Sequence, residues 1–237
     1  MDTLLDSKLL VVGLWQNRDV WVFISIIFLL LIAFSRIVFP KVFLATYSVT
    51  RFFSIRLKDD FGTGLRLLST EYLHFTYLLS SAIAFNLLLL NDQFEEHVFL
   101  PFWLKPEGVL EVLLVWMGLS VVLILMFLLR YAMVSGFGKL FNLPNGLTRH
   151  FQEAQSLNQV FVLFVTVLII LVLYSGFYFP LKIANALLVL CVLYVIYRQI
   201  NLYIKFLSTG TYSKLYIFSY LCTTEIIPVF IGVKLVL

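Results

Sequence analysis

Six stretches of mostly apolar residues, each long enough to cross a bilayer as a helix, follow one another along the 237-residue chain. A transmembrane helix needs about 20 such residues, because the hydrocarbon layer is about 30 Å thick. Inside that layer every backbone polar group must be bonded within the protein, which a helix achieves by itself. The sequence therefore predicts spans at residues 20–39, 72–90, 109–134, 157–177, 181–200 and 213–236.

The composition agrees with this interpretation. Hydrophobic residues make up 62% of the chain and charged residues 13%, whereas soluble domains carry about 25% charged residues. We expect an all-α fold, a polytopic transmembrane bundle of about six helices that forms a single integral membrane domain over residues 1–237. The first apolar stretch follows no basic region, so we expect a retained helix and not a signal peptide.

Lysine and arginine are distributed unevenly between the two sides of this bundle. Twelve of them lie on or beside the first, third and fifth connections, and five lie on the opposite side. Connections rich in Lys and Arg stay in the cytoplasm. The distribution predicts that both termini lie outside and that the three basic connections face the cytoplasm.

The first connection, residues 40–71, alternates aromatic and apolar residues with basic ones. Such a composition is typical of an amphipathic segment lying in the headgroup region, where basic side chains meet anionic lipid. The connection is either a plain anchor or a platform for a partner. The basic residues that we consider candidates for lipid or partner docking, one of them from the third connection, are Arg51, Arg56, Lys58, Arg66 and Arg149.

The third connection, residues 135–156, breaks the apolar pattern with turn-forming residues. Gly136, Gly138 and Pro144 are followed by the pair Asn145-Gly146. Exposed irregular backbone is excluded from lipid, so re-entry into the membrane requires cover by other helices. We predict a cytoplasmic loop here, with re-entry as the alternative.

The last apolar stretch carries a carboxylate, Glu225, near its middle. An ionisable group at that depth is costly and marks a candidate intramembrane site. Pro228 lacks an N–H and so frees the carbonyl of Thr224, while Thr223 adds a hydroxyl. Asn86 lies at a similar depth in the second stretch and is the best candidate partner. Glu225 either stabilises contacts between helices or, with these neighbouring groups, binds a proton or small cation.

Other classes of function are not expected. No soluble segment combines a basic stripe with aromatic residues, which argues against nucleic-acid binding. Glu95, Glu96 and His97 are adjacent and cannot converge on one ion, so we expect no metal site. The sequence contains no GxSxG, HExxH, phosphate-binding or dinucleotide-binding pattern. We therefore expect neither catalysis nor a cofactor.

The C-terminal run Leu-Cys-Thr-x-Glu-Ile-x-Pro resembles the signature of an uncharacterised family of small polytopic inner-membrane proteins of Bacteroidota. The matching positions are Leu221, Cys222, Thr223, Glu225, Ile226 and Pro228. The resemblance implies a multi-pass protein of the bacterial inner (cytoplasmic) membrane, which places the outside termini in the periplasm. It implies no assigned activity.

Bacteria of this group have elaborate envelope export systems, which favours an accessory role. We expect a non-catalytic accessory or scaffold subunit of an envelope protein-export or assembly complex. Its partners would be membrane lipids and other inner-membrane or envelope subunits. The alternative is a small proton- or cation-coupled transporter that uses Glu225.

Overall fold

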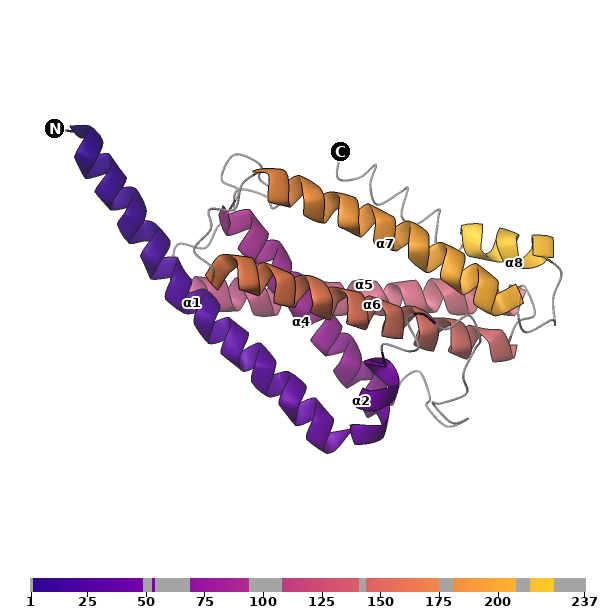
Figure 1. Cartoon of the computed structure of the whole chain (residues 1–237). Coiled ribbons are helices and arrows are strands. Elements are labelled where there is room, and N and C mark those ends of the chain that lie inside the picture. The colour runs from indigo at the N-terminus through magenta and orange to yellow at the C-terminus, as the bar shows by residue number, and fades with distance from the viewer. Residues whose placement is uncertain are drawn as a thin grey trace. The chain divides into compact units, whose positions relative to one another are not determined.

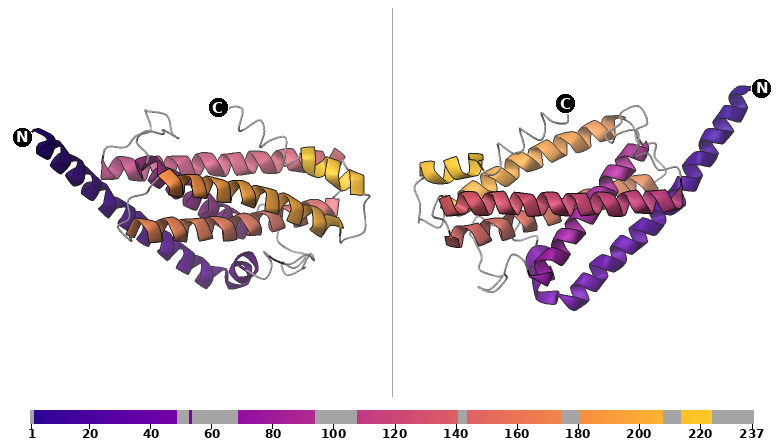
Figure 2. Two further views of the ribbon diagram at one scale, coloured as in Figure 1. Left: turned by 45° about the horizontal axis from the view of Figure 1, so that its top comes forward. Right: turned by 180° about the vertical axis from the view of Figure 1, so that it is seen from behind.

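The computed structural model describes residues 2–48, 53, 69–93, 108–140, 144–174, 181–207 and 214–223. All the regular structure in these residues is helical, which confirms the all-α fold (Figure 1). Over these ranges there are seven helices: α1 (Asp2–Val38), α2 (Pro40–Thr46), α4 (Thr70–Gln93), α5 (Val109–Leu140), α6 (Pro144–Tyr174), α7 (Leu181–Leu207) and α8 (Lys214–Leu221). Figure 2 shows them from two further sides.

Five of these helices are long and apolar enough to cross a membrane. Their candidate spans are Asp19–Val38, Thr70–Asn91, Val109–Gly136, Phe151–Val172 and Asn185–Leu207. Each overlaps one of the first five predicted stretches, so the chain is a multi-pass membrane protein. Beyond Thr223 the sixth predicted stretch, 213–236, lies outside the described residues.

Most of the connection over residues 135–156, where the sequence predicts a loop, is helical. Helix α5 continues to Leu140, and α6 begins at Pro144. Proline is favoured in the first turn of a helix, where its missing N–H would have no partner in any case. Pro144 therefore starts α6 instead of interrupting it. Whether this region faces the cytoplasm stays a prediction.

Of the first connection, residues 40–71, the structure describes α2, the two residues after it, Phe53 and the residues from Ser69 onward. In α2 Lys41 and Leu44 are exposed, while Thr46 is buried. Phe53 is 71% exposed. The four basic residues that we singled out in this connection, Arg51, Arg56, Lys58 and Arg66, lie outside the described residues.

The chain divides into two compact units by its internal contacts. The first unit comprises residues 1–40 and 77–124, and the second comprises residues 41–76 and 125–237. Helices α4 and α5 each contribute residues to both units. The expected single domain over 1–237 stays a prediction.

The first unit is held by aromatic contacts of α4. The ring of Trp21 on α1 meets that of Phe85 edge-on, with centroids 6.0 Å apart. The indole N–H of Trp116 on α5 donates to the carbonyl oxygen of Ser81 at 3.1 Å. The α4 residues Ser80, Ser81, Ala82 and Ala84 are all buried. Small residues of this kind let helices approach closely within lipid.

The second unit has an apolar core built from four helices. Tyr131 of α5 meets Phe151 of α6 edge-on, with ring centroids 5.1 Å apart. The buried residues of this core come from α5, α6, α7 and α8, and they are Val134, Phe151, Ala154, Leu157, Leu202, Phe206, Ile217, Tyr220 and Leu221. This core holds the first half of the α6 span against the neighbouring helices. We call it the polar half of α6, because it carries Glu153, Ser156, Asn158 and Gln159.

Candidate functional site

Helix α6 carries a group of polar side chains inside its candidate span. Glu153, Ser156, Asn158 and Gln159 are all buried. A buried polar group costs free energy unless it is hydrogen-bonded. Their bonding partners therefore show what this polar segment does.

An ion pair joins α6 to α7. The ammonium of Lys205 donates to Glu153 Oε2 at 2.8 Å, and the two side chains are 0% and 1% exposed. Glu153 lies near the start of its span, and Lys205 lies near the end of the α7 span. Each charge offsets the desolvation of the other, which either would suffer alone.

A second contact between the same helices lies deeper in the spans. The Asn158 amide oxygen of α6 accepts a hydrogen bond from the Tyr194 hydroxyl at 2.7 Å and one from the Arg198 guanidinium at 3.1 Å. The ring of Tyr194 also stacks on Phe161, with centroids 3.7 Å apart and planes 3° from parallel. The Asn158 amide oxygen thus accepts hydrogen bonds from two residues of α7, Tyr194 and Arg198.

Four polar residues of α7 form a stripe along the helix. Tyr194, Arg198, Asn201 and Lys205 are spaced four, three and four residues apart, which places them on one helical face. Arg198 and Lys205 are two of the twelve basic residues predicted to lie on or beside cytoplasmic connections, but both are buried. Their spacing of seven residues was a signal in the sequence that they share a helical face.

A different set of contacts joins α6 to α4. The Gln159 amide donates to the carbonyl oxygen of Phe75 at 2.6 Å, and the Gln155 amide donates to the Thr76 hydroxyl at 3.2 Å. The Thr76 hydroxyl in turn donates to the carbonyl oxygen of Tyr72 at 2.9 Å. These bonds fix the first turns of α4 against the polar half of α6.

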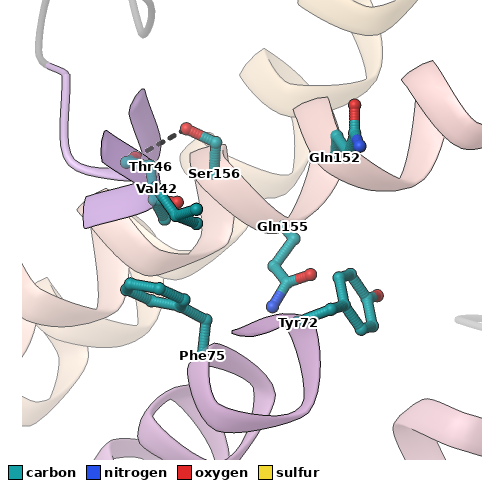
Figure 3. A pocket seen from close by; sticks show the side chains of 7 residues that line it. All are labelled: Val42, Thr46, Tyr72, Phe75, Gln152, Gln155 and Ser156. Atoms are coloured by element: carbon teal, nitrogen blue, oxygen red, sulfur yellow. Dashed lines mark hydrogen bonds between the residues drawn. The ribbon is translucent and has the colours of Figure 1, made fainter. Parts of the chain in front are cut away.

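Helix α2 is joined to α6 by one further bond. The Ser156 hydroxyl donates to the carbonyl oxygen of Thr46 at 2.7 Å (Figure 3). The next residue, Tyr47, packs its ring against Phe43 and Phe75, with centroids 4.7 and 6.3 Å away. Burial raises the pKa of the Tyr47 phenol well above its ordinary value. The phenol is therefore neutral at physiological pH.

A pocket lies between α2, α4 and the polar half of α6. Its empty volume is about 320 Å³, a value that includes solvent space at its open side. Val42 and Thr46 line it from α2, and Tyr72 and Phe75 line it from α4. Figure 3 shows the Gln155 side chain reaching from α6 toward the turn of α4 that carries Tyr72. The pocket thus has aromatic and aliphatic walls with an amide at one side.

The predicted intramembrane site is described only in part. Asn86 is buried in α4 with 8% exposure, and it belongs to the first unit. The Thr223 hydroxyl donates to the carbonyl oxygen of Ser219 at 2.9 Å. Glu225, Thr224 and Pro228 lie outside the described residues, so the proposed grouping stays a prediction.

Arg149 belongs to the first part of α6. Within the described ranges, no group of three or more His, Cys, Asp or Glu side chains is placed to hold a metal ion. The two cysteines, Cys191 and Cys222, are both free thiols.

Comparison with curated proteins and with solved structures finds no significant match. The sequence profile of a family described as a domain of unknown function, DUF4271, matches residues 21–236. The match extends from the first candidate span to beyond the C-terminal signature, and it agrees with the resemblance to an uncharacterised family. This multi-pass membrane protein belongs to the DUF4271 family.

Proposed function

We propose that the protein is a non-catalytic component of the bacterial inner membrane, an accessory or scaffold subunit of an envelope protein-export or assembly complex. The proposal rests on the bonds that the polar residues of α6 make to other helices. Glu153, Asn158, Ser156 and Gln159 each bond to a neighbouring helix. A segment whose polar groups bond to other helices is suited to holding a fixed arrangement.

Register specificity supports this role. If α7 slid along α6 by one residue, the Lys205 ammonium would leave the Glu153 carboxylate, and the two donors on Asn158 would be displaced. A buried charge separated from its partner is strongly unfavourable. The polar contacts therefore favour one register of α6 and α7, and a docking surface built on these helices would keep a constant shape.

Exposed apolar faces of α5 and α7 support lateral contacts. Only 17% of the α5 span and 22% of the α7 span are buried. Such faces suit lipid tails or the helices of partner subunits, which pack by shape within the bilayer. The exposed residues include Leu114, Met117, Leu125, Met126 and Leu129 of α5, and Leu188, Val192, Leu193 and Ile196 of α7.

The proposed orientation keeps both termini in the periplasm. Arg198 and Lys205 are buried and no longer count as connection charges, but the other basic residues still favour the same side as cytoplasmic. Partner docking at the cytoplasmic face would then involve the candidate docking residues Arg51, Arg56, Lys58, Arg66 and Arg149.

The test is gentle extraction of the tagged full-length protein from its native membrane, with identification of co-purifying proteins by mass spectrometry. We expect an envelope export or assembly subunit in stoichiometric amount. Arg51→Glu with Arg56→Glu should reduce its recovery severalfold, while Lys214→Glu, a change at an exposed basic residue of α8, should not. Recovery of the protein only as a monomer or homo-oligomer, also after cross-linking in the membrane, would contradict the proposal.

A second candidate is a small proton- or cation-coupled transporter that uses Glu225, because this carboxylate lies near the middle of the last apolar stretch and intramembrane ionisable groups often mark ion pathways. Glu225→Gln preserves shape and hydrogen-bonding capacity. A transporter should lose flux in proteoliposomes after this change, whereas a scaffold should recover its partner as before.

A further inference from the structure

The buried charges of the second unit are two basic side chains and one acidic side chain, counted over its described residues. They are Arg198, Lys205 and Glu153. The Lys205 ammonium pairs with the Glu153 carboxylate. The Arg198 guanidinium donates one hydrogen bond to the neutral amide oxygen of Asn158, and a guanidinium has further N–H donors. Charged side chains within membrane spans usually pair with one another, so we expect a second carboxylate near Arg198.

Helix α8 runs back along the end of α7, and one ring contact indicates their register. Figure 1 and Figure 2 show the two helices side by side and antiparallel. The rings of Tyr203 on α7 and Phe218 on α8 meet edge-on, with centroids 6.4 Å apart. Arg198 precedes Tyr203 by about 7.5 Å along its helix, at about 1.5 Å per residue. If the last helix continues beyond Thr223, Glu225 follows Phe218 by about 10 Å and lies at nearly the same level as Arg198.

The last described turn determines which face of this helix Glu225 lies on. The buried residues of α8 share one face, and they are Ile217, Tyr220 and Leu221. In an unbroken α-helix Thr224 would come next on that face. Cys222 and Thr223, however, are π-helical. A π turn spans five residues where an α turn spans four, so the next position on the buried face moves from Thr224 to Glu225.

An amide beside Arg198 supports a polar contact at this level. The amide nitrogen and oxygen of Gln199 are both buried, and neither is hydrogen-bonded within the described part of the chain. Gln199 precedes Leu202 by three residues and Phe206 by seven, so it shares their face of α7, which joins the core with α8. A buried amide is costly unless a polar group bonds to it. The Glu225 carboxylate can accept a hydrogen bond from its nitrogen.

We propose that the Glu225 carboxylate forms an ion pair with the Arg198 guanidinium and thereby fixes the last helix of the chain against α7. Both residues belong to the second unit, whereas Asn86, the partner expected from the sequence, belongs to the first. The pair does for the last helix what the Glu153–Lys205 pair does for α6. The proposal does not rest on the scaffold role. It makes Glu225 a counter-ion of Arg198 and not a proton carrier.

The experiment is a double-mutant cycle on the purified full-length protein, unfolded by denaturant in mixed micelles. Arg198→Met and Glu225→Leu should each lower the ratio of folded to unfolded protein about a hundredfold or more, because each leaves a buried charge without its partner. The double variant Arg198→Met with Glu225→Leu replaces both charges by apolar side chains. Its ratio should return to within about tenfold of the unaltered protein.

A matched cycle on the same face of α7 is the control. Lys205 lies seven residues beyond Arg198 and is paired with Glu153. The losses from Lys205→Met and Glu225→Leu should therefore be additive in free energy. If the single variants do not accumulate as folded protein, the amounts of the double variants in the membrane give the same comparison. Arg198→Met with Glu225→Leu should then accumulate, and Lys205→Met with Glu225→Leu should not.

Two results would overturn the proposal. Additive losses from Arg198→Met and Glu225→Leu would show that the two side chains do not meet. Coupling of Glu225→Leu to Asn86→Leu, with none to Arg198→Met, would assign the carboxylate to the first unit. The chain is purified without other subunits, so neither result depends on whether the protein works within a complex.

Discussion

The Lys205 ammonium lies 2.8 Å from Glu153 Oε2, and neither side chain is more than 1% exposed. The two residues are 52 positions apart in sequence. Their contact joins α6 to α7, and Leu157 of α6 and Leu202 and Phe206 of α7 belong to the buried core of the second unit. This pair is therefore the most direct test of how the second unit is held together.

Replacement of Lys205 by methionine should destabilise the protein strongly. The buried Glu153 carboxylate loses its ammonium, and breaking a buried ion pair in this way costs about 3–5 kcal/mol. The double change Lys205→Met with Glu153→Leu should recover most of that loss, because apolar residues replace both charges. Denaturant unfolding in mixed micelles measures the effect, with Lys214→Met on the exposed surface of α8 as control. A double variant as unstable as the single one would contradict this account.

A core substitution should separate packing from lipid contact on a single helix. Leu202 of α7 is 0% exposed, whereas Ile200 of the same helix is 54% exposed. Leu202→Ala should cost about 2–3 kcal/mol, the low end of the range for core cavities, because lipid is as apolar as leucine. Ile200→Ala should cost well under about 1 kcal/mol. Equal effects in micelle unfolding would show that the described core is not the packed one.

The first unit offers an independent test at Trp116. Its indole N–H bonds to the Ser81 carbonyl oxygen, and the side chain is 3% exposed. Trp116→Phe removes this bond and leaves unfilled space, with an expected loss of about 1–3 kcal/mol. Hydrogen exchange should become faster in the first unit. Val121→Leu, at a 51% exposed position of the same helix, is the control and should leave exchange unchanged.

Stability should fall at alkaline pH through Tyr47, which lies outside the candidate spans. Its pKa is raised in the folded protein by burial, from an ordinary value of 10.0. Below pH 10 both states hold the proton, and the contribution is fully present. Above it the unfolded chain loses the proton first, so stability falls by up to about 1.4 kcal/mol per pH unit. Tyr47→Phe should show a shallower decline in unfolding free energy between pH 10 and 11; an identical decline would refute the burial effect.

The fold class and the helices followed from hydropathy because the physical requirement is simple. A bilayer demands about 20 apolar residues for each span, and the stretch around Ile24 and the one around Leu125 meet that requirement without any tertiary information. The boundaries were less accurate. Pro144 and Gly146 were interpreted as a loop, although proline is also suited to the first turn of a helix.

The candidate site was harder to predict because it depends on pairing across helices. Glu153, taken alone, is a polar residue that hydropathy assigns to the membrane surface. Only its contact with Lys205 makes burial favourable, and a sequence does not state that these two residues meet. The stripe of Tyr194, Arg198 and Lys205 was visible in the spacing, but the spacing alone does not show which helix it faces. Asn86 lies inside the candidate span of α4, and its pairing with Glu225 stays a prediction.

The contact of Arg198 with Asn158 bears on how the chain enters the membrane during synthesis. Arg198 is nine residues from the end of its span at Leu207, about 13 Å along the helix. If α7 entered lipid alone, it would carry this guanidinium into hydrocarbon without the amide oxygen that accepts its hydrogen bond. An arginine near the centre of a lone helix costs about 2.5–3.5 kcal/mol on insertion scales. Release from the insertion machinery is therefore easiest when α6 and α7 leave it together, already paired.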